Sequence, residues 1–421
     1  MTLANKIKQI REKKKLSQEA LAKMMNYTRS YVSAWECEKR PITSEVLDTF
    51  RAAVGLPGVP LTNDEVIQYK HQLYDWRSNV VYGEFHKAKE LQPILAQGAE
   101  WSCDKDLKAL YDLFSASFYY SVGNAEAYKK VMGSLYAQKH DFNDEQLHWY
   151  YRLVGIRELT NRQYKRALNS FCEAEKLGNH LGLDDVMLNY NIANCLTNMG
   201  YVSLAIKYLE AAQKMAKETP IHRFDGYIRL LIAANYSNSG RCHEAIAILY
   251  DCIRDERERY GTNSALSGMY HRLAIAYSKL EDTTNALKYL DEAALCITEN
   301  KGSHNYNFYL RARILLTDNK IDEGMDCLDK GLQLADKGTL YHTLLSSLKH
   351  SMLLNANQSR LHMEKVAIPC LLSYGKYQDA ASYYYKLGKF YEQQQKYKQS
   401  AEYSFLAYEL SNKLIKGDIE L

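Results

Sequence analysis

The stretch that decides the fold reads Ala193-x-x-Leu196-x-x-x-Gly200-Tyr201-x-x-x-Ala205-Ile206-x-x-Leu209-x-x-Ala212. Its apolar residues recur three or four positions apart on both sides of Gly200, which is the spacing of two amphipathic helices. Gly200 tolerates the positive φ of a tight turn. Small residues at 193 and 205 allow close packing, because the distance between two helices depends on the side chains at their contact. The stretch therefore predicts a helical hairpin.

The same pattern returns along the chain with a period of about 39 residues. The small residue in the place of Ala205 forms the series Ala88, Ala127, Ala167, Ala205, Ala245, Ala286 and Gly324. His362 and Ser400 take this place in the last two units, and Pro369 enters the eighth. Because one hairpin cannot bury its own apolar face, we expect about nine to stack over residues 62–421. The predicted fold is all-α, with a right-handed superhelix whose concave surface is lined by the first helices.

A different helical pattern occupies residues 1–57. Ile7 and Ile10 recur at helical spacing, and Ser17 is placed as the N-cap of a second helix. Asn26 suits the tight turn that follows, because asparagine adopts positive φ at low cost. A third helix is expected over 28–36, with Thr28 as its cap, and a fourth over 44–54.

The charge of the chain is concentrated in this first module. Residues 1–41 hold ten Lys or Arg and four Glu, a net charge of +6, whereas the other residues sum to −2. A basic module attracts phosphate whatever the nucleic-acid sequence. We expect residues 58–61 to be the linker between this module and the repeats.

Three segments of the first module resemble the repressor-type (Cro/CI or XRE) helix-turn-helix: Ile7-x-x-Ile10-Arg11, Leu16-Ser17-Gln18-Glu19-Ala20-Leu21-Ala22 and Trp35-Glu36-x-x-Lys39-Arg40-Pro41. The resemblance implies that the third helix enters the major groove of double-stranded operator DNA. It assigns DNA contacts to Gln18, Thr28, Arg29, Ser30, Ser33, Lys39 and Arg40. Gln18, Lys39 and Arg40 would meet the phosphate backbone, and Arg29 and Ser30 the base edges. The alternative is a helix-turn-helix that makes protein contacts only.

The repeats are similar to the tetratricopeptide repeat, although their period exceeds the usual 34 residues. In that repeat the inner face of the first helix binds ligand. Here the face is rich in side chains that bind peptide backbone (Asn), offer flat half-polar area (Tyr) or pair with a carboxylate (Arg). The predicted peptide-binding residues are Tyr190, Asn194, Asn198, Tyr227, Asn235, Asn238, His271, Tyr306, Tyr309 and Arg313. The alternative is that these side chains are ordinary packing or solvated residues.

The combination of this helix-turn-helix with about nine such repeats resembles the RNPP family of peptide-pheromone receptors, and its NprR branch most. Tyr190-Asn191-Ile192-Ala193-Asn194 is similar to the segment that supplies a backbone-binding Asn in that family. The resemblance implies a cytoplasmic, homodimeric regulator that binds operator DNA and is controlled by a short signalling peptide in the repeat groove. In the Rap branch, members instead bind a response regulator. We therefore keep as the alternative function a scaffold that sequesters a response regulator or a phage partner, with DNA binding secondary. Gln68 and Gln72 are the candidates for its surface.

The sequence lacks the patterns of common enzymes and cofactor sites. It contains no GxxxxGK[ST] loop, no GxGxxG after a strand and no HExxH. The nine cysteines are scattered and never spaced as CxxC, which favours a reducing cytoplasm over a disulfide framework or a zinc site. The N-terminal residues are charged and lack the apolar core of a secretory signal. We expect no enzymatic activity and no cofactor.

Overall fold

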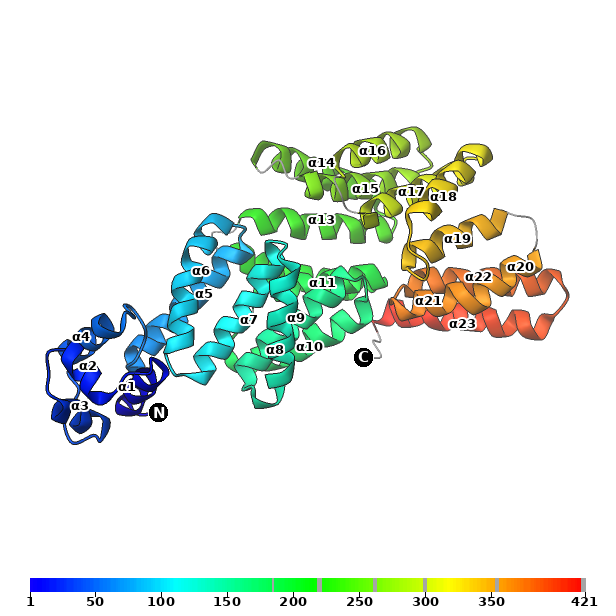
Figure 1. Ribbon diagram of the computed structural model, residues 1–421. Coiled ribbons are helices and arrows are strands. Elements are labelled where there is room, and N and C mark those ends of the chain that lie inside the picture. The colour runs from blue at the N-terminus through cyan, green and yellow to red at the C-terminus, as the bar shows by residue number, and fades with distance from the viewer. Residues whose placement is uncertain (184, 218–221, 260–262, 298–300, 353–355, 418–421) are drawn as a thin grey trace. The chain divides into compact units, whose positions relative to one another are not determined.

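The computed structural model describes residues 1–421 except 184, 218–221, 260–262, 298–300, 353–355 and 418–421 (Figure 1). The regular structure in the described residues is helical throughout, so the predicted all-α class is confirmed. Two compact units make up the chain, Met1–Leu153 and Val154–Leu421. Their boundary lies inside helix α9 (Asp144–Thr160), well beyond the predicted linker.

Four helices form the N-terminal module, close to the predicted bounds: α1 (Leu3–Lys13), α2 (Gln18–Met24), α3 (Arg29–Glu36) and α4 (Ser44–Val54). The hydroxyl of Ser17 caps α2 by accepting a hydrogen bond from the backbone N–H of Ala20 at 3.0 Å. Asn26 has a φ of 59°, as its place in the turn requires. Thr28 precedes α3, but its hydroxyl bonds to that of Ser30 at 2.7 Å and makes no helix cap.

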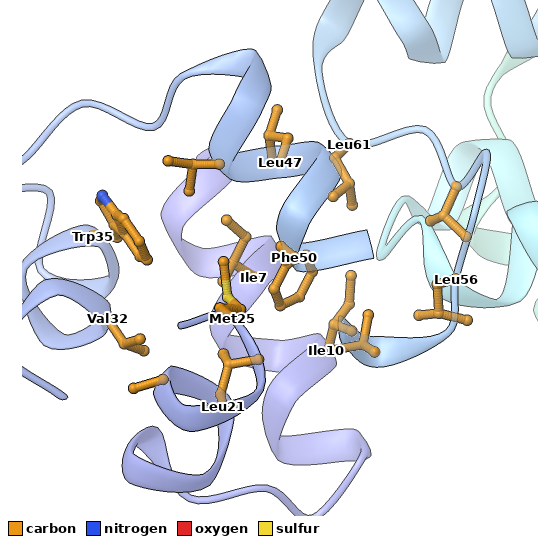
Figure 2. Close-up of a cluster of buried hydrophobic side chains, with 14 residues drawn as sticks. Ile7, Ile10, Leu21, Met25, Val32, Trp35, Leu47, Phe50, Leu56 and Leu61 are labelled. Atoms are coloured by element: carbon orange, nitrogen blue, oxygen red, sulfur yellow. The ribbon is translucent and has the colours of Figure 1, made fainter. Parts of the chain in front are cut away.

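One hydrophobic cluster holds these four helices together (Figure 2). Its members come from every helix, and Ile10 and Phe50 are almost completely buried. Val59 and Leu61 belong to the same cluster. The segment 58–61 is therefore part of the packed module rather than a free linker, because burial of these two side chains removes their apolar surface from water.

The first unit continues with helices that pair as hairpins: α5 (Asn63–Val81), α6 (Phe85–Trp101), α7 (Lys105–Ser121) and α8 (Ala125–Gln138), followed by the short turn η1 (Lys139–Asp141) and the start of α9. A capping box of Thr62 and Glu65 begins α5. The indole N–H of Trp76 donates to the carbonyl of Ala88 at 2.8 Å, and its ring stacks on Tyr111. Ala88, the first small residue of the repeat series, is completely buried there.

The second unit continues the hairpins after α9, as α10 (Tyr164–Leu181), α11 (Val186–Met199), α12 (Val202–Lys217), α13 (His222–Asn238), α14 (Cys242–Arg259), α15 (Asn263–Lys279), α16 (Thr283–Cys296), α17 (Lys301–Thr317), α18 (Ile321–Leu334), α19 (Leu340–Met352), α20 (Ala356–His362), the π-helical turn η2 (Met363–Ala367), α21 (Ile368–Ser373), α22 (Tyr377–Gln393) and α23 (Tyr397–Lys416). Figure 1 shows α22 and α23 side by side, as one such hairpin. From α5 to α23, the described residues form nine hairpins, the predicted number.

Small residues sit where paired helices approach most closely, as predicted. A Cβ added to Gly155 would lie 2.7 Å from the ring of Phe171 on α10, and one added to Gly324 would lie 2.7 Å from Leu316. Ala205 and Ala245 are completely buried at the corresponding places. Real Cβ atoms do not approach other atoms this closely, so side-chain size at these positions sets the hairpin spacing.

The eighth hairpin departs from the pattern where the sequence does. Its second half is broken into α20, η2 and α21, with Pro369 at the start of α21. The ring of His362 stacks on that of His350 with centroids 4.4 Å apart, in a place where other units have small side chains. A π-helical turn inserts one residue into the helical ladder, and here it follows this bulky pair directly.

The last helices of the second unit lie against its first helices. A Cβ added to Gly375 would lie 3.2 Å from the backbone nitrogen of Lys165 on α10, and one added to Gly417 would lie 3.0 Å from Leu204 on α12. Helices α12 and α23 are in contact. The hairpins of this unit therefore close into a ring, with α22 facing back toward α11.

Candidate functional site

The exposed face of α3 carries the side chains predicted to read DNA bases. Val32 and Trp35 of this helix are buried in the module core, whereas Arg29 and Ser30 are exposed and Ser33 is half-buried. This division follows from the helical period, which places positions three or four apart on one face. This face, with one arginine and two serines, offers donors and acceptors to base edges.

Two further predicted contacts, Lys39 and Arg40, lie exposed in the segment after α3. The guanidinium of Arg40 lies 4.1 Å from the centre of the Tyr31 ring. Such a cation–π contact orients the guanidinium without neutralising its charge, so Arg40 keeps its capacity to bind phosphate.

Gln18 has a structural contact that the sequence did not reveal. Its amide Nε2 donates to Oε2 of Glu36 at 2.9 Å, and the guanidinium of Arg11 donates to both oxygens of the same carboxylate at 2.6 and 3.0 Å. Arg11 and Glu36 are buried. The Glu of the Trp-Glu pair therefore ties α1, α2 and α3 together, and one donor of Gln18 is used within the protein.

Several basic residues of the module are also occupied internally. The ammonium of Lys6 donates to the carbonyl of Leu61 at 2.8 Å. Lys13 pairs with the carboxylate of Glu100 at 2.5 Å, and the ammonium groups of Lys13 and Lys14 lie 4.4 and 4.6 Å from the centre of the Trp101 ring. These contacts dock the end of α1 on the end of α6 and engage the three ammonium groups within the protein.

The second unit contains a pocket of about 380 Å³ on its inner side. First helices of successive hairpins line it, namely α11, α13, α15, α17 and α19, and α22 lines the opposite wall. This size and this mixture of aromatic and polar side chains are typical of a ligand site. The lining residues are Arg162, Tyr164, Thr197, Asn198, Asn238, Arg272, Ile275, Lys279, Tyr306, Tyr309, Leu310, Arg313, Leu340, Tyr341, Leu344, Lys376, Gln378, Asp379 and Ser382.

Half of the predicted peptide-binding residues line this pocket: Asn198, Asn238, Tyr306, Tyr309 and Arg313. Asn194 lies one helical turn before Asn198, and its carbonyl and amide oxygens accept hydrogen bonds from the Asn198 amide at 2.9 and 2.8 Å. Asn194 therefore positions Asn198 without lining the pocket itself.

The other predicted residues lie outside the lining. Asn235 is 0% exposed, and its amide nitrogen donates to the Thr197 hydroxyl and the Leu231 carbonyl, both at 2.8 Å. His271 is buried against the ring of Tyr306. These two residues pack between neighbouring first helices, which corrects their placement on the open face. Tyr190 and Tyr227 are half-buried, with their ring centroids 6.3 Å apart.

Among the pocket residues that sequence reasoning missed are three cations and an aromatic side chain, Arg162, Arg272, Lys376 and Tyr341. Arg162 and Lys376 lie at hairpin turns, which the helix-face analysis did not cover. Arg162 has a φ of 60° at a turn where another unit has Gly200, and a charged side chain in that place was a usable signal. Lys376 reaches the pocket only because the unit closes on itself.

The described residues contain no cluster of three His, Cys, Asp or Glu side chains suited to hold a metal ion. None of the described helices is long and apolar enough to cross a membrane.

Comparison with known families identifies the modules. Residues 7–57 match the helix-turn-helix family HTH_3, and residues 188–219 and 267–294 match a tetratricopeptide repeat family. The chain joins a helix-turn-helix to tetratricopeptide repeats. No match was found among curated protein sequences.

Solved structures extend the likeness beyond the matched segments. NprR in complex with its cognate peptide NprX has a TM-score of 0.72 at 18% identity, over 82% of this chain and 98% of that chain. A Rap protein complexed with competence and sporulation factor has a TM-score of 0.69 at 15% identity, over the same shares. The apo quorum sensor NprR from B. thuringiensis has a TM-score of 0.60 at 18% identity, over 81% and 98%. The predicted fold and the predicted combination of modules, on which the resemblance to the RNPP family rests, are thus confirmed.

Proposed function

We propose that this helix-turn-helix and tetratricopeptide-repeat protein is a cytoplasmic transcription regulator whose affinity for DNA is controlled by a short signalling peptide. The observation that carries the proposal is the pocket of the second unit, where side chains from α11, α13, α15, α17 and α22 converge. Solved structures with this fold include NprR in complex with its cognate peptide NprX and a Rap protein complexed with competence and sporulation factor.

Peptide recognition follows from the chemistry of the lining. Asn238 offers an amide donor and acceptor to a peptide backbone that no strand satisfies. Asn198 lies in the same lining, and its amide would exchange the present bonds to Asn194 and Lys376 for bonds to the peptide. Tyr306, Tyr309 and Tyr341 offer broad aromatic faces to peptide side chains. Because these residues come from different hairpins, a bound peptide would draw the hairpins together and favour one arrangement of the ring over others.

DNA recognition is assigned to the exposed face around α3. We propose that Arg29 and Ser30 meet base edges and that Lys39 and Arg40 hold phosphates. Thr28 and Ser33 flank these residues and extend the face, and Gln18 contributes to phosphate contact through its remaining amide proton. A homodimer would place two such faces on half-sites about one helical turn apart, roughly 34 Å.

Operator selection from a random DNA pool, followed by binding isotherms, tests the DNA-binding part. Replacement of Arg29 by Ala is expected to weaken binding to the selected DNA by about tenfold to a hundredfold and to relax base preference at one position. Lys8→Ala is the matched control, because Lys8 is an exposed cation on α1 of the same module. Equal losses of affinity for both variants would show that the N-terminal module binds DNA only by nonspecific charge attraction.

The peptide-binding part is tested by the change in DNA affinity on adding a pool of random synthetic heptapeptides. We expect the wild type to respond and Asn238→Ala to respond less. Asn412→Ala is the control, since Asn412 lies on α23 and not in the pocket lining. A DNA affinity that no pool alters would contradict peptide control.

Sequestration of a partner protein is the second candidate, favoured by the Rap-like fold and by a polar cavity of about 970 Å³ in the first unit. Gln68 and Gln72 line a separate, smaller cavity beside Arg51 and Pro60. An Arg29→Ala variant that kept its full biological effect would favour this function over DNA binding.

A further inference from the structure

The pocket of the second unit has an unbalanced charge. Its lining contains one carboxylate, Asp379, and five cationic side chains: Arg162, Arg272, Lys279, Arg313 and Lys376. The cations come from four places, so no single helix face explains their convergence: the α9–α10 turn (Arg162), α15 (Arg272 and Lys279), α17 (Arg313) and the turn before α22 (Lys376). Concave walls of low dielectric concentrate the field of such a group.

Cations elsewhere in the second unit have carboxylate partners. Arg229 pairs with Asp225 at 2.8 Å, and Arg360 pairs with Glu364 at 2.7 Å. Arg311, on the same helix as the pocket residue Arg313, pairs with Asp291. Each of these three cations is thus matched by a carboxylate.

The five pocket cations differ in this respect. Within the described part of the chain, none of them has a carboxylate oxygen closer than 4.0 Å, Asp379 included. The ammonium of Lys279 donates to the Ser237 carbonyl at 2.7 Å. The guanidinium of Arg162 lies 4.6 Å from the centre of the Tyr341 ring. Carbonyls and rings orient these cations but leave their charge uncancelled.

Among these groups, Lys279 carries the effect of its positive neighbours. Burial lowers the pKa of Lys279, and the positive charges of Arg313 and Arg272 lower it further. Gathering like charges costs free energy unless an opposite charge enters the same space. A carboxylate is the anion that matches the planar, two-pronged donor edge of an arginine.

We propose that the pocket selects anionic peptides that carry at least two carboxylates, one at the C-terminus and one or more on Asp or Glu side chains. This inference rests on the proposed peptide-binding function and adds the charge class of the ligand. One terminal carboxylate would engage two of the five cations at most in bidentate geometry, and the rest of the excess charge calls for acidic side chains. The flanking rings of Tyr306 and Tyr309 favour a peptide over a bare inorganic anion.

Three pools of synthetic heptapeptides test the proposal with the full chain. Each pool has two fixed positions, occupied by Asp, Ser or Lys, and random uncharged residues elsewhere. Peptides retained after ultrafiltration are counted by mass spectrometry at physiological ionic strength. We expect the Asp pool to be retained about tenfold more than the Ser pool and the Lys pool least. An Asp pool with amidated C-termini should be retained less than the free acid.

Variants assign the effect to the pocket. Arg313→Gln and Arg272→Gln should each lower the ratio of Asp to Ser retention severalfold, and Arg313→Lys should keep most of it. Arg311→Gln should leave the ratio unchanged, because Arg311 faces Asp291 rather than the pocket. Circular dichroism of each variant shows whether it is folded. Because Arg313→Lys keeps the positive charge, it separates the effect of losing the charge from the effect of changing the side chain.

The outcomes separate this inference from the proposed function. Equal retention of the Asp, Ser and Lys pools would overturn the charge preference and leave peptide binding intact. Retention of no pool would overturn both. Displacement of the Asp pool by inorganic phosphate at equal concentration would overturn the peptide assignment in favour of a simple anion site.

Discussion

Lys376 donates hydrogen bonds to the backbone carbonyl of Asn198 at 3.2 Å and to its side-chain oxygen at 3.3 Å, across 178 positions of sequence. The same ammonium lies 4.7 Å from the centre of the Tyr164 ring. The residue before α22 is thus fastened to the end of α11 and to the start of α10. Together with the contact between α12 and α23, this contact closes the hairpins of the unit into a ring and gives the pocket its far wall.

Removal of this fastening is expected to loosen the ring without unfolding the hairpins. In Lys376→Met the apolar stem is kept and the charged donor is lost, which costs about 1 kcal/mol for a half-buried contact. Hydrogen exchange should accelerate at the C-terminal end of α11 and the N-terminal end of α22. Lys365→Met, at an exposed lysine in η2, is the control. Unchanged exchange in the Lys376 variant would show that other contacts close the ring.

The buried pair of Arg11 and Glu36 should be essential to the N-terminal module. Removal of either partner leaves a buried charge without its counterpart, at a cost of about 3–5 kcal/mol. We expect Arg11→Met and Glu36→Leu each to abolish hydrogen-exchange protection in α1–α4. The double variant, which leaves no charge unpaired, should recover much of it. A double variant as unstable as the two singles combined would contradict this account.

Two glycines test the role of helix spacing. Gly155→Ala places a methyl group within 2.7 Å of Phe171, and overpacking of this kind costs about 1–3 kcal/mol. Gly133→Ala, in the exposed middle of α8 with no atom within 4 Å, should instead stabilise the chain by about 0.5–1 kcal/mol through helix propensity. Opposite shifts in melting temperature are the expected result, and shifts of equal sign would show that α9 and α10 separate freely.

His271 should make stability depend on pH in the mildly acidic range. Burial, followed by the charge of Arg272, lowers the pKa of His271 from 6.5 to about 4. Below pH 6.5, His271 is therefore protonated in the unfolded chain but stays neutral in the folded chain until the pH nears 4. The free energy of unfolding falls as the pH drops from 6.5 toward 4. The slope approaches about 1.4 kcal/mol per pH unit.

Urea midpoints at pH 7 and pH 5 measure this effect. His271→Phe keeps an aromatic ring against Tyr306 and removes the titrating group, so its midpoint should fall less between the two pH values than that of the wild type. An equal fall of the urea midpoint in the wild type and in His271→Phe would show that other groups cause the acid sensitivity.

The sequence alone determined the elements and their pairing. The spacing of small residues such as Ala205 and Gly324 predicted nine hairpins, because only small side chains permit the close approach at these points. Ser17 and Asn26 marked the limits of helices in the first module, because caps and positive φ are local properties of a few neighbouring residues. The same local logic placed Arg29 and Ser30 on an exposed face.

Only the tertiary structure decided which side chains meet in the pocket. A helix-face pattern does not fix the rotation of one hairpin against the next, so Asn235 and His271 were placed in the groove although they are buried between helices. Ring closure brings Lys376 to Asn198, and long-range contacts of this kind leave no period in the sequence. The excess of cations in the pocket arises from the same closure, because residues from α9–α10 to α22 acquire a common surface only when the ring is formed.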